Sequence, residues 1–134
     1  MQIVLCSDNR VLAERLGLAV GAEFITYCVS TEEQLFDVFA AGEIAVIVLD
    51  ARIVDHASAL CMRLRANTDV PILAIAHGRD VTERVRLLAA GADDVLAWPF
   101  EMAELVARVH AKLRWFLTRQ QTSDASRATG GGHA

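Results

Sequence analysis

The sequence predicts an α/β fold in which five parallel strands form one doubly wound sheet with helices on both faces. Its 134 residues, 54% hydrophobic and 22% charged, are typical of one compact domain and leave no room for a second full one. Short apolar runs alternate along the chain with longer stretches of helical periodicity. Since strand–helix–strand crossovers are right-handed in nearly all proteins, this alternation predicts a doubly wound sheet.

Five apolar runs are the predicted strands. They cover residues 3–6, 24–29, 44–49, 72–76 and, as the weakest of the five, 95–98. The first four runs are aliphatic or β-branched on both faces, as strands buried between two layers of helices must be. We therefore expect these strands to form the centre of the domain.

Apolar residues that recur every three or four positions predict the helices between the strands. Each stripe covers one side of a helix. The stripes are Val11, Leu12, Leu16 and Val20; Leu35, Val38 and Phe39; Leu60 and Leu64; and Val81, Val85 and Leu88. A last helix is predicted from about residue 100 to about residue 117.

Residues that start and end helices favour the same division of the chain into strands and helices. Ser30 followed by Glu33 is a capping box, in which a hydroxyl and a carboxylate bind the first free amides of a helix. Asp80 offers a similar start to the next helix but one. Gly42 and Gly91 are placed to end helices in a left-handed conformation, which costs least for glycine.

The chain changes character after residue 118. Residues 118–134 lose the apolar periodicity, gain Gln, Ser, Thr and Arg, and include three consecutive glycines. We therefore predict a folded domain over residues 1–118 and a flexible linker or tail over residues 119–134.

Composition argues against several classes of function. Thirteen basic and seventeen acidic residues give a net charge of −4, which is unlike the cationic surface that binds nucleic acid or anionic lipid. Three cysteines without close pairing or a secretory signal favour a reducing cytoplasm. No apolar run approaches the ~20 residues that cross a bilayer. The predictions are a soluble, cytoplasmic protein without membrane contact, and DNA contact only through a separate domain.

Polar residues follow three of the predicted strands and should meet, with Trp98, at the carboxyl edge of the sheet, where such folds bind ligands. Ser7 and Asp8 follow the first strand, Asp50 the third, His77 the fourth, and Trp98 lies at the end of the fifth. Asp8 and Asp50 could share a divalent cation such as Mg2+. Alternatively, Asp8 only caps the first helix. Asp50 ends an apolar run, where a charge needs a partner or a function.

The sequence resembles a known family, the receiver domains of bacterial response regulators in two-component phosphorelay signalling. The match covers about residues 2–117. It is strongest at 91–100, GADDVLAWPF, followed by Glu104-Leu105 and Ala107-Arg108. This segment is similar to the branch attached to winged-helix DNA-binding domains. The resemblance implies a (βα)5, flavodoxin-like fold.

The resemblance assigns roles to the polar edge. Asp50 matches the aspartate that accepts the phosphoryl group, and Asp8 matches one member of the acidic pair that binds the cation. The backbone carbonyl of Arg52 would be the remaining protein ligand. Ser7 stands where the family has its second acidic residue, so any Mg2+ site should be weak or absent.

Three further positions depart from the family. Trp98 replaces the lysine, Ala76 replaces the switch threonine or serine, and Val95 replaces the switch aromatic residue. Phosphoryl transfer depends on positioned cations and hydrogen-bond donors, and removing one donor typically costs ~10² to 10³ in rate. Ordinary phosphotransfer is therefore not expected, and no cofactor is required. We expect Trp98 to fill the space of the missing lysine, with a cis bond to Pro99.

Charged residues matching the family's dimer contacts are retained. Arg84 and Glu104 correspond to one pair, and Asp94 and Arg108 to another, on the fourth helix, fifth strand and fifth helix. The alternative is that they are ordinary solvated charges, because exposed ion pairs contribute only ~0 to 1 kcal/mol. Their retention favours a homodimer, in which each pair occurs twice.

Three functions follow from this reading. The first is an atypical receiver, not an enzyme, that acts by dimerisation and controls transcription through a separate DNA-binding domain. The second is a slow but genuine phosphoacceptor, with a histidine kinase as partner and His77 or Arg79 as substitute cation. The third is a flavodoxin-like domain that binds a small ligand, although no phosphate-binding loop or dinucleotide motif supports it.

Overall fold

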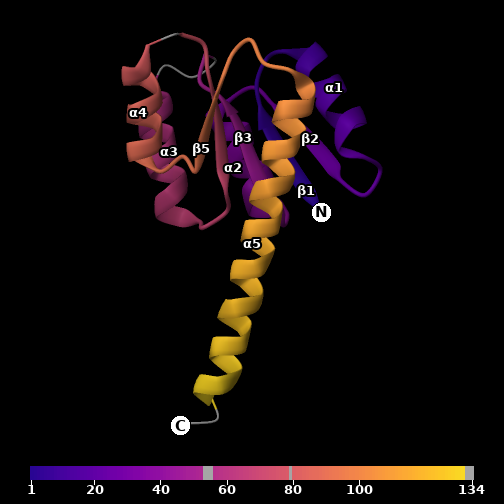
Figure 1. Ribbon diagram of the computed structural model, residues 1–134, viewed down its shortest axis with the longest axis vertical. Helices are drawn as coiled ribbons and strands as arrows, with labels where there is room; N and C mark the ends of the chain where they lie inside the picture. The colour runs from indigo at the N-terminus through magenta and orange to yellow at the C-terminus, as the bar shows by residue number, and fades with distance from the viewer. Residues whose placement is uncertain (53–55, 79, 132–134) are drawn as a thin grey trace.

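A single parallel sheet with strand order β2-β1-β3-β4-β5 forms the centre of the computed structural model, which describes residues 1–52, 56–78 and 80–131. The elements in chain order are β1 (Gln2–Cys6), α1 (Arg10–Val20), β2 (Ile25–Val29), α2 (Glu32–Ala41), β3 (Ile44–Asp50), α3 (Ala57–Asn67), β4 (Ile72–Ala76), α4 (Val81–Ala90), β5 (Asp94–Ala97) and α5 (Met102–Gly131). Figure 1 shows this arrangement. The predicted doubly wound, five-stranded fold is confirmed.

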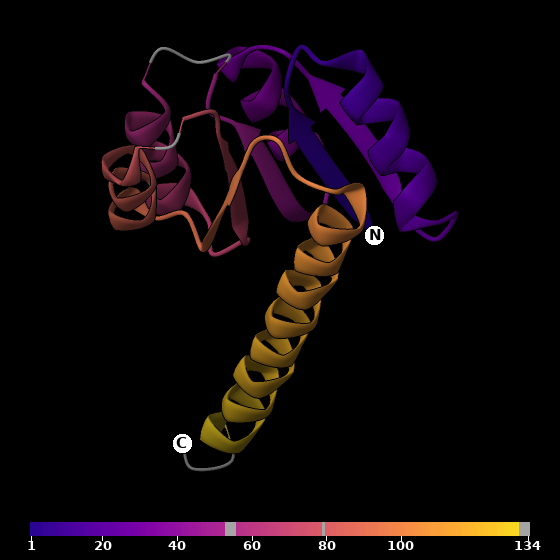
Figure 2. The same ribbon diagram turned by 45° about the horizontal axis from the view of Figure 1, so that its top comes forward.

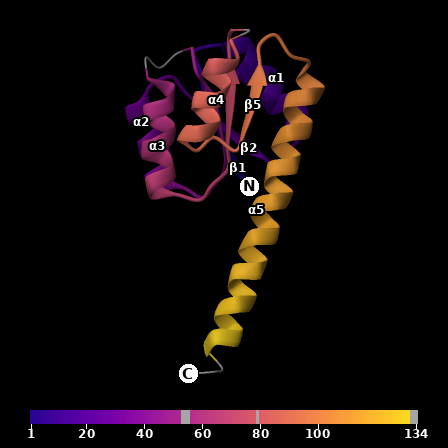
Figure 3. The same cartoon turned by 60° about the vertical axis from the view of Figure 1, so that its left-hand side comes forward.

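Helices cover both faces of the sheet, and each face has its own apolar core. On one face α1 and α5 pack against the sheet through residues such as Leu16 and Val109. On the other face α2, α3 and α4 contribute residues such as Leu35, Leu60 and Leu87. Figure 3 shows α5 on one side of the sheet and α2 and α3 on the other. The central strands β1, β3 and β4 are therefore buried from both sides, as their composition predicts.

Two predicted apolar surfaces are more exposed than the pattern suggested. β2 lies at the edge of the sheet, and its side chains Ile25 and Tyr27 are 53% and 38% exposed. On α4, the residues Val81, Val85 and Leu88 face solvent, whereas Leu87 packs into the core. Both surfaces leave apolar side chains exposed to solvent.

Of the two predicted helix caps, the structure confirms one and corrects the other. Asp80 caps α4 by accepting a hydrogen bond from the amide of Thr82, as predicted. The cap of α2 is Thr31 instead of Ser30: Thr31 accepts from the amide of Gln34, whose side chain accepts from the amide of Ser30. The capping chemistry is the one predicted, shifted along the chain by one residue.

Of the two predicted helix-ending glycines, only Gly91 has a positive φ, at +125°. Gly42 ends α2 with extended backbone instead, so that prediction was wrong. A Cβ at Gly91 would lie 3.0 Å from the Cβ of Arg65. Both the backbone conformation and the space therefore favour glycine at this position.

Replacing Gly91 with alanine is expected to lower the free energy of unfolding by about 1–3 kcal/mol, because alanine is strained at this φ. The matched control is Gly17→Ala. Gly17 lies inside α1, and a Cβ there meets nothing within 4 Å. That change should stabilise the protein by roughly 0.5–1 kcal/mol. Urea denaturation of both variants measures the difference, and two changes of the same sign would contradict this explanation.

The last helix is longer than predicted. α5 begins at Met102 and continues to Gly131, so the expected end near residue 117 was wrong. Residues 118–129 contain neither proline nor glycine, and nothing in them terminates a helix before the glycines at the end. Figure 2 shows this part of α5 projecting away from the sheet. A projecting helix needs no apolar stripe, which is why periodicity did not reveal it.

The role of residues 119–134 as a linker remains a prediction. Within the described ranges, no helix has the length and apolar character that crossing a membrane requires.

Candidate functional site

The carboxyl ends of β1, β3 and β4 bring Ser7, Asp50 and His77 together. Asp50 is the last residue of β3, at the centre of the sheet, while Ser7 and His77 directly follow the two neighbouring strands. The sequence predicted this meeting, because strand ends at one edge of a parallel sheet are neighbours. The contacts between the three side chains determine what the site can do.

Both oxygens of the Asp50 carboxylate are occupied by groups of the same chain. The carboxylate is only 1% exposed. Its Oδ2 accepts a hydrogen bond from the hydroxyl of Ser7 at 2.8 Å. Its Oδ1 accepts from the amide of Arg52 at 3.1 Å and lies 2.7 Å from Nε2 of His77. Asp50 is thus a buried carboxylate with its hydrogen bonds satisfied internally, as burial of a charge requires.

Ser7 is held in place from two sides. Besides donating to Asp50, its hydroxyl oxygen accepts a hydrogen bond from the amide of Asn9 at 3.1 Å. Asn9 is the N-cap of α1, and its side chain accepts from the amide of Leu12. The start of α1 therefore fixes the position of the Ser7 hydroxyl, which donates to Oδ2 of Asp50. This contact also shows that Asn9, and not Asp8, caps the helix.

Trp98 does not fill a buried space, contrary to expectation. It is 40% exposed, and its ring stacks on the imidazole of His77 with centroids 5.6 Å apart and an interplanar angle of 24°. Phe100 packs edge-on against Trp98. The peptide bond from Trp98 to Pro99 is cis, as predicted. Trp98 and Asp50 therefore bracket His77, which is mostly buried instead of being an ordinary solvated loop residue.

The donor set does not fit the divalent cation that the resemblance implies. Asp8 is exposed and pairs with the guanidinium of Arg52 at 3.2 Å. The Ser7 hydroxyl donates its proton to Asp50, whose oxygens are both engaged. Among the described residues no group of three or more His, Cys, Asp or Glu side chains could hold a metal ion. Groups of the same chain contact the two carboxylates instead: the Arg52 guanidinium pairs with Asp8, and the His77 imidazole lies against Asp50.

The two remaining altered positions are apolar in the structure as well. Ala76 is the last residue of β4 and is fully buried, without a hydroxyl that could follow a modified Asp50. Val95, in β5, packs against the core on the face of α2, α3 and α4. Neither side chain links the Asp50 site to the surface of α4 and β5 by a polar contact.

The Asp50 carboxylate also acts on the thiol of Cys6. Burial, and after it the negative charge of Asp50, raises the pKa of Cys6 to about 11. Cys6 is fully buried and stays neutral at physiological pH, so it packs as a small apolar residue.

The charges expected at a dimer interface pair largely within the chain. Arg108 donates from Nη1 to both oxygens of Asp94, at 2.9 and 2.8 Å, and from Nη2 to Glu104 at 3.1 Å. The hydrogen bonds to Asp94 raise the pKa of Arg108 above its ordinary value. Arg84 on α4 has a buried Nε without a hydrogen-bond partner among the described residues. Three of the four residues thus cluster, Asp94 of β5 with Glu104 and Arg108 of α5, while Arg84 lies on α4.

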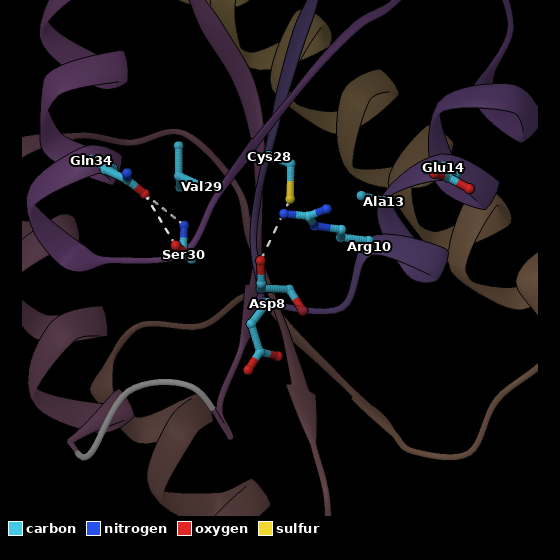
Figure 4. A pocket seen from close by; sticks show the side chains of 9 residues that line it. Asp8, Arg10, Ala13, Glu14, Cys28, Val29, Ser30 and Gln34 are labelled. Carbon is cyan, nitrogen blue, oxygen red and sulfur yellow. Dashed lines mark hydrogen bonds between the residues drawn. The ribbon is translucent and has the colours of Figure 1, made fainter.

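A cavity of about 500 Å³ opens beside the site, between α1, β2 and α2. Figure 4 shows Arg10 and Glu14 of α1 on one side and Ser30 and Gln34 on the other, with Cys28 between them. No feature of the sequence predicted this cavity. It lies where the carboxyl ends of β1 and β2 meet the first turns of α1 and α2.

Comparisons with known proteins agree on one family. The chain matches no protein-family model. Over 117 residues it is 33% identical to the transcriptional regulatory protein PmrA of Pectobacterium parmentieri. It is 29% identical, also over 117 residues, to the cell cycle transcriptional regulator CtrA of Caulobacter vibrioides. Each match covers 85% of this chain, together with 53% of PmrA and 51% of CtrA. The receiver domain of the TMAO respiratory system response regulator TorR superposes with a TM-score of 0.80 at 27% identity, covering 86% of this chain and 98% of that one.

The chain is a response-regulator receiver domain. It spans about half the length of the curated relatives it matches. The resemblance assigns the phosphoacceptor to Asp50, and the positions of the second acidic residue, the lysine and the switch hydroxyl to Ser7, Trp98 and Ala76; these assignments stay predictions.

The sequence placed His77 near Asp50 as a substitute cation, and the structure adds a direct contact of 2.7 Å between Nε2 of His77 and Oδ1 of Asp50. The pair of Arg52 with Asp8 had no signal in the sequence. Arg79, which was considered as a substitute cation, lies outside the described residues.

Proposed function

We propose that this receiver signals by protein–protein contact without phosphorylation, as the dimerisation module of a transcription regulator whose DNA-binding domain is separate. The observation that carries the proposal is the Asp50 carboxylate, which is buried and bonded on both oxygens to groups of its own chain. The printed names of PmrA and CtrA describe transcriptional regulators, which supports an output of the same kind.

The electrostatics of the site support phosphorylation independence. An incoming phosphoryl donor is strongly anionic and needs fixed positive charge close to the acceptor oxygen. Among the described residues no Lys or Arg side chain hydrogen-bonds Asp50, and Arg52 contributes only its backbone amide there. To receive a phosphoryl group, Asp50 would also have to break its bond to Ser7 or to His77. The site therefore needs no cofactor in this proposal.

The surface of α4, β5 and α5 is the proposed homodimer face. It carries the exposed apolar residues Val81, Val85 and Leu88 of α4 beside the charged cluster around Arg108. Apolar area at the centre with charged residues around it is typical of protein interfaces. A two-fold axis through this surface would bring Arg84, whose Nε has no partner in the described part of the chain, towards Glu104 of the second copy.

The dimer face predicts how molecular mass depends on concentration. Sedimentation from low to high micromolar protein is expected to show a dimer whose mass does not change with acetyl phosphate and Mg2+. Glu104→Arg should shift the protein towards monomer, because it places like charges beside Arg108 and Arg84. The matched control is Glu33→Arg on α2, far from this face, which should leave the dimer intact. A monomer at all concentrations, or equal behaviour of the two variants, would remove this part of the proposal.

The slow phosphoacceptor is the second candidate, and the contact between His77 and Asp50 favours it. A protonated imidazole 2.7 Å from Oδ1 would supply one positive charge where the family has its lysine. In that case a histidine kinase would be the partner. The direct test of this alternative is a stable, Asp50-dependent gain in mass.

A further inference from the structure

Helix α4 is held to the sheet by few side chains. Within α4, all of which the structure describes, Leu87 is the one buried residue, and Ala90 packs partly against the same core. By contrast, α1 and α3 each bury three apolar side chains. A helix that buries little apolar surface opens locally more readily, so the position of α4 depends on the contacts at its two ends.

The two ends of α4 differ in how they are fixed. After the last turn, the amide of Ala92 donates to the carbonyl of Leu87, and the guanidinium of Arg65 donates to the carbonyl of Gly91. At the other end, the carboxylate of Asp80 caps the helix that it starts. Among the described residues, no hydrogen bond or ion pair joins the first turn of α4 to another element. The position of this turn therefore depends on the loop that leads to it from β4.

The loop before α4 is fixed at His77, its first residue. The imidazole lies 2.7 Å from Oδ1 of Asp50 and stacks on the ring of Trp98, with centroids 5.6 Å apart. The amide of Trp98 also donates to the carbonyl of Ala76 at 2.8 Å. Trp98 thus contacts both a backbone group and a side chain of the segment that leads into α4.

Trp98 contacts the segment that leads into α5 as well. Its ring meets the ring of Phe100 edge-on, with centroids 5.1 Å apart. Phe100 packs against the core on the face of α1 and α5, and α5 begins two residues later at Met102. Stacked and edge-on contacts are the two arrangements that aromatic side chains favour, and one indole makes both here. Trp98 therefore connects the segments that precede α4 and α5.

We propose that Trp98 is a positioning residue that holds the start of α4 in a fixed place relative to α5. Val81, Val85 and Leu88, the exposed apolar residues of α4, then keep one arrangement beside the charged residues of α5. The inference rests on the proposed function for the role of this surface as a dimer face. It adds that the face is already formed in the unmodified protein, because the two ring contacts of Trp98 involve no oxygen of Asp50.

The first test measures hydrogen exchange of the backbone amides of α4 in variants of residue 98. Trp98→Leu keeps an apolar side chain but removes the ring, so the amides of α4 should exchange at least ~10-fold faster, while those of α1 stay unchanged. Trp98→Phe keeps a ring and should retain most of the protection. Tyr27→Leu is the matched control and should leave α4 unchanged, because Tyr27 is a similarly exposed aromatic residue on the opposite edge of the sheet.

The exchange pattern shows whether the role of Trp98 is local. Faster exchange in all helices of Trp98→Leu would mean that this residue supports the whole fold and does not position α4, which overturns the proposal. Exchange in α4 that is the same in Trp98→Leu as in the unchanged protein, or the same in Trp98→Leu as in Trp98→Phe, would show that the ring contacts do not hold the helix.

A double-mutant cycle tests the contact between Trp98 and His77. His77→Ala should also raise the exchange rate of the α4 amides, and adding Trp98→Leu should raise it little further, because both changes break the same contact. Effects that simply add would show that the two residues act on α4 separately, which contradicts the proposed connection.

Molecular mass separates this inference from the proposed function. If the unchanged receiver is a dimer, Trp98→Leu should weaken it at least ~10-fold and Trp98→Phe should not, because the apolar residues of α4 lose their fixed position only in the first variant. A dimer that Trp98→Leu leaves intact, although α4 exchanges faster, overturns the positioning of the dimer face but not the dimer. A protein that is monomeric at all concentrations removes the proposed dimer face, and the exchange rates then still decide whether Trp98 holds α4.

Discussion

A variant with Ser7→Asp, Ala76→Thr and Trp98→Lys is expected to take up a phosphoryl group at least ~10²-fold faster than the unchanged receiver. Trp98→Lys supplies the fixed cation next to Asp50 and removes the ring that stacks on His77. Ser7→Asp removes the hydroxyl that donates to Asp50 and adds a second carboxylate for Mg2+. Ala76→Thr returns a hydroxyl to the end of β4. All three groups act on charge that develops on the transferred phosphoryl group.

Intact-mass measurement with acetyl phosphate and Mg2+ follows this reaction over time. The control carries the same three changes with Asp50→Ala, and it should gain no mass. Trp98→Lys alone is expected to give a smaller gain, because Ser7 still occupies Oδ2 of Asp50. If the triple variant folds and yet reacts no faster than the unchanged protein, the missing residues are not what makes the site inert.

Arg65→Ala is expected to lower the free energy of unfolding by about 2–4 kcal/mol, because hydrogen bonds to a charged group are lost together. The Arg65 guanidinium donates to the carbonyls of Thr68, Val70 and Gly91 and to the carboxylate of Asp93. Asp93 also accepts from the amide of Ile72. One side chain thus connects the end of α3 to the start of β4 and to the turn before β5.

Arg63→Ala is the matched control for that change. Arg63 lies two residues earlier on α3 and also pairs with an acid, Glu32, but both side chains are exposed. Exposed pairs contribute only ~0 to 1 kcal/mol, so its loss should change stability within that range. Urea denaturation of the two variants gives the comparison. Equal losses would show that Arg65 does not connect these elements in solution.

The sequence predicted the fold well, because the signals for it are local. Runs of buried aliphatic residues indicated β1, β3 and β4, and the alternation with helical stripes indicated their parallel arrangement. The extent of α5 was missed, since a helix that leaves the domain needs no apolar stripe. The exposure of Val81 and Val85 was also missed, because periodicity shows which side of a helix is apolar but not what that side contacts.

The sequence predicted which residues meet at the site, but not which hydrogen bonds they form with one another. The carboxyl-edge rule brought Ser7, Asp50 and His77 to one place. It did not show that the Ser7 hydroxyl and the His77 imidazole would bind the two oxygens of Asp50, because side-chain orientation depends on neighbouring elements. The stack of Trp98 on His77 has the same origin. Because of these contacts, we interpret Asp50 as a carboxylate whose two oxygens are already bound by its own chain, and not as a weakened phosphoacceptor.

The most direct test is the mass of the unchanged receiver after incubation with acetyl phosphate and Mg2+, and with a histidine kinase that phosphorylates other receivers. Because Asp50 is bonded to Ser7 and His77, and no Lys or Arg side chain among the described residues hydrogen-bonds it, we expect no stable gain of a phosphoryl group. A rapid gain that disappears in Asp50→Ala, accompanied by a change in the oligomeric state, would contradict the account.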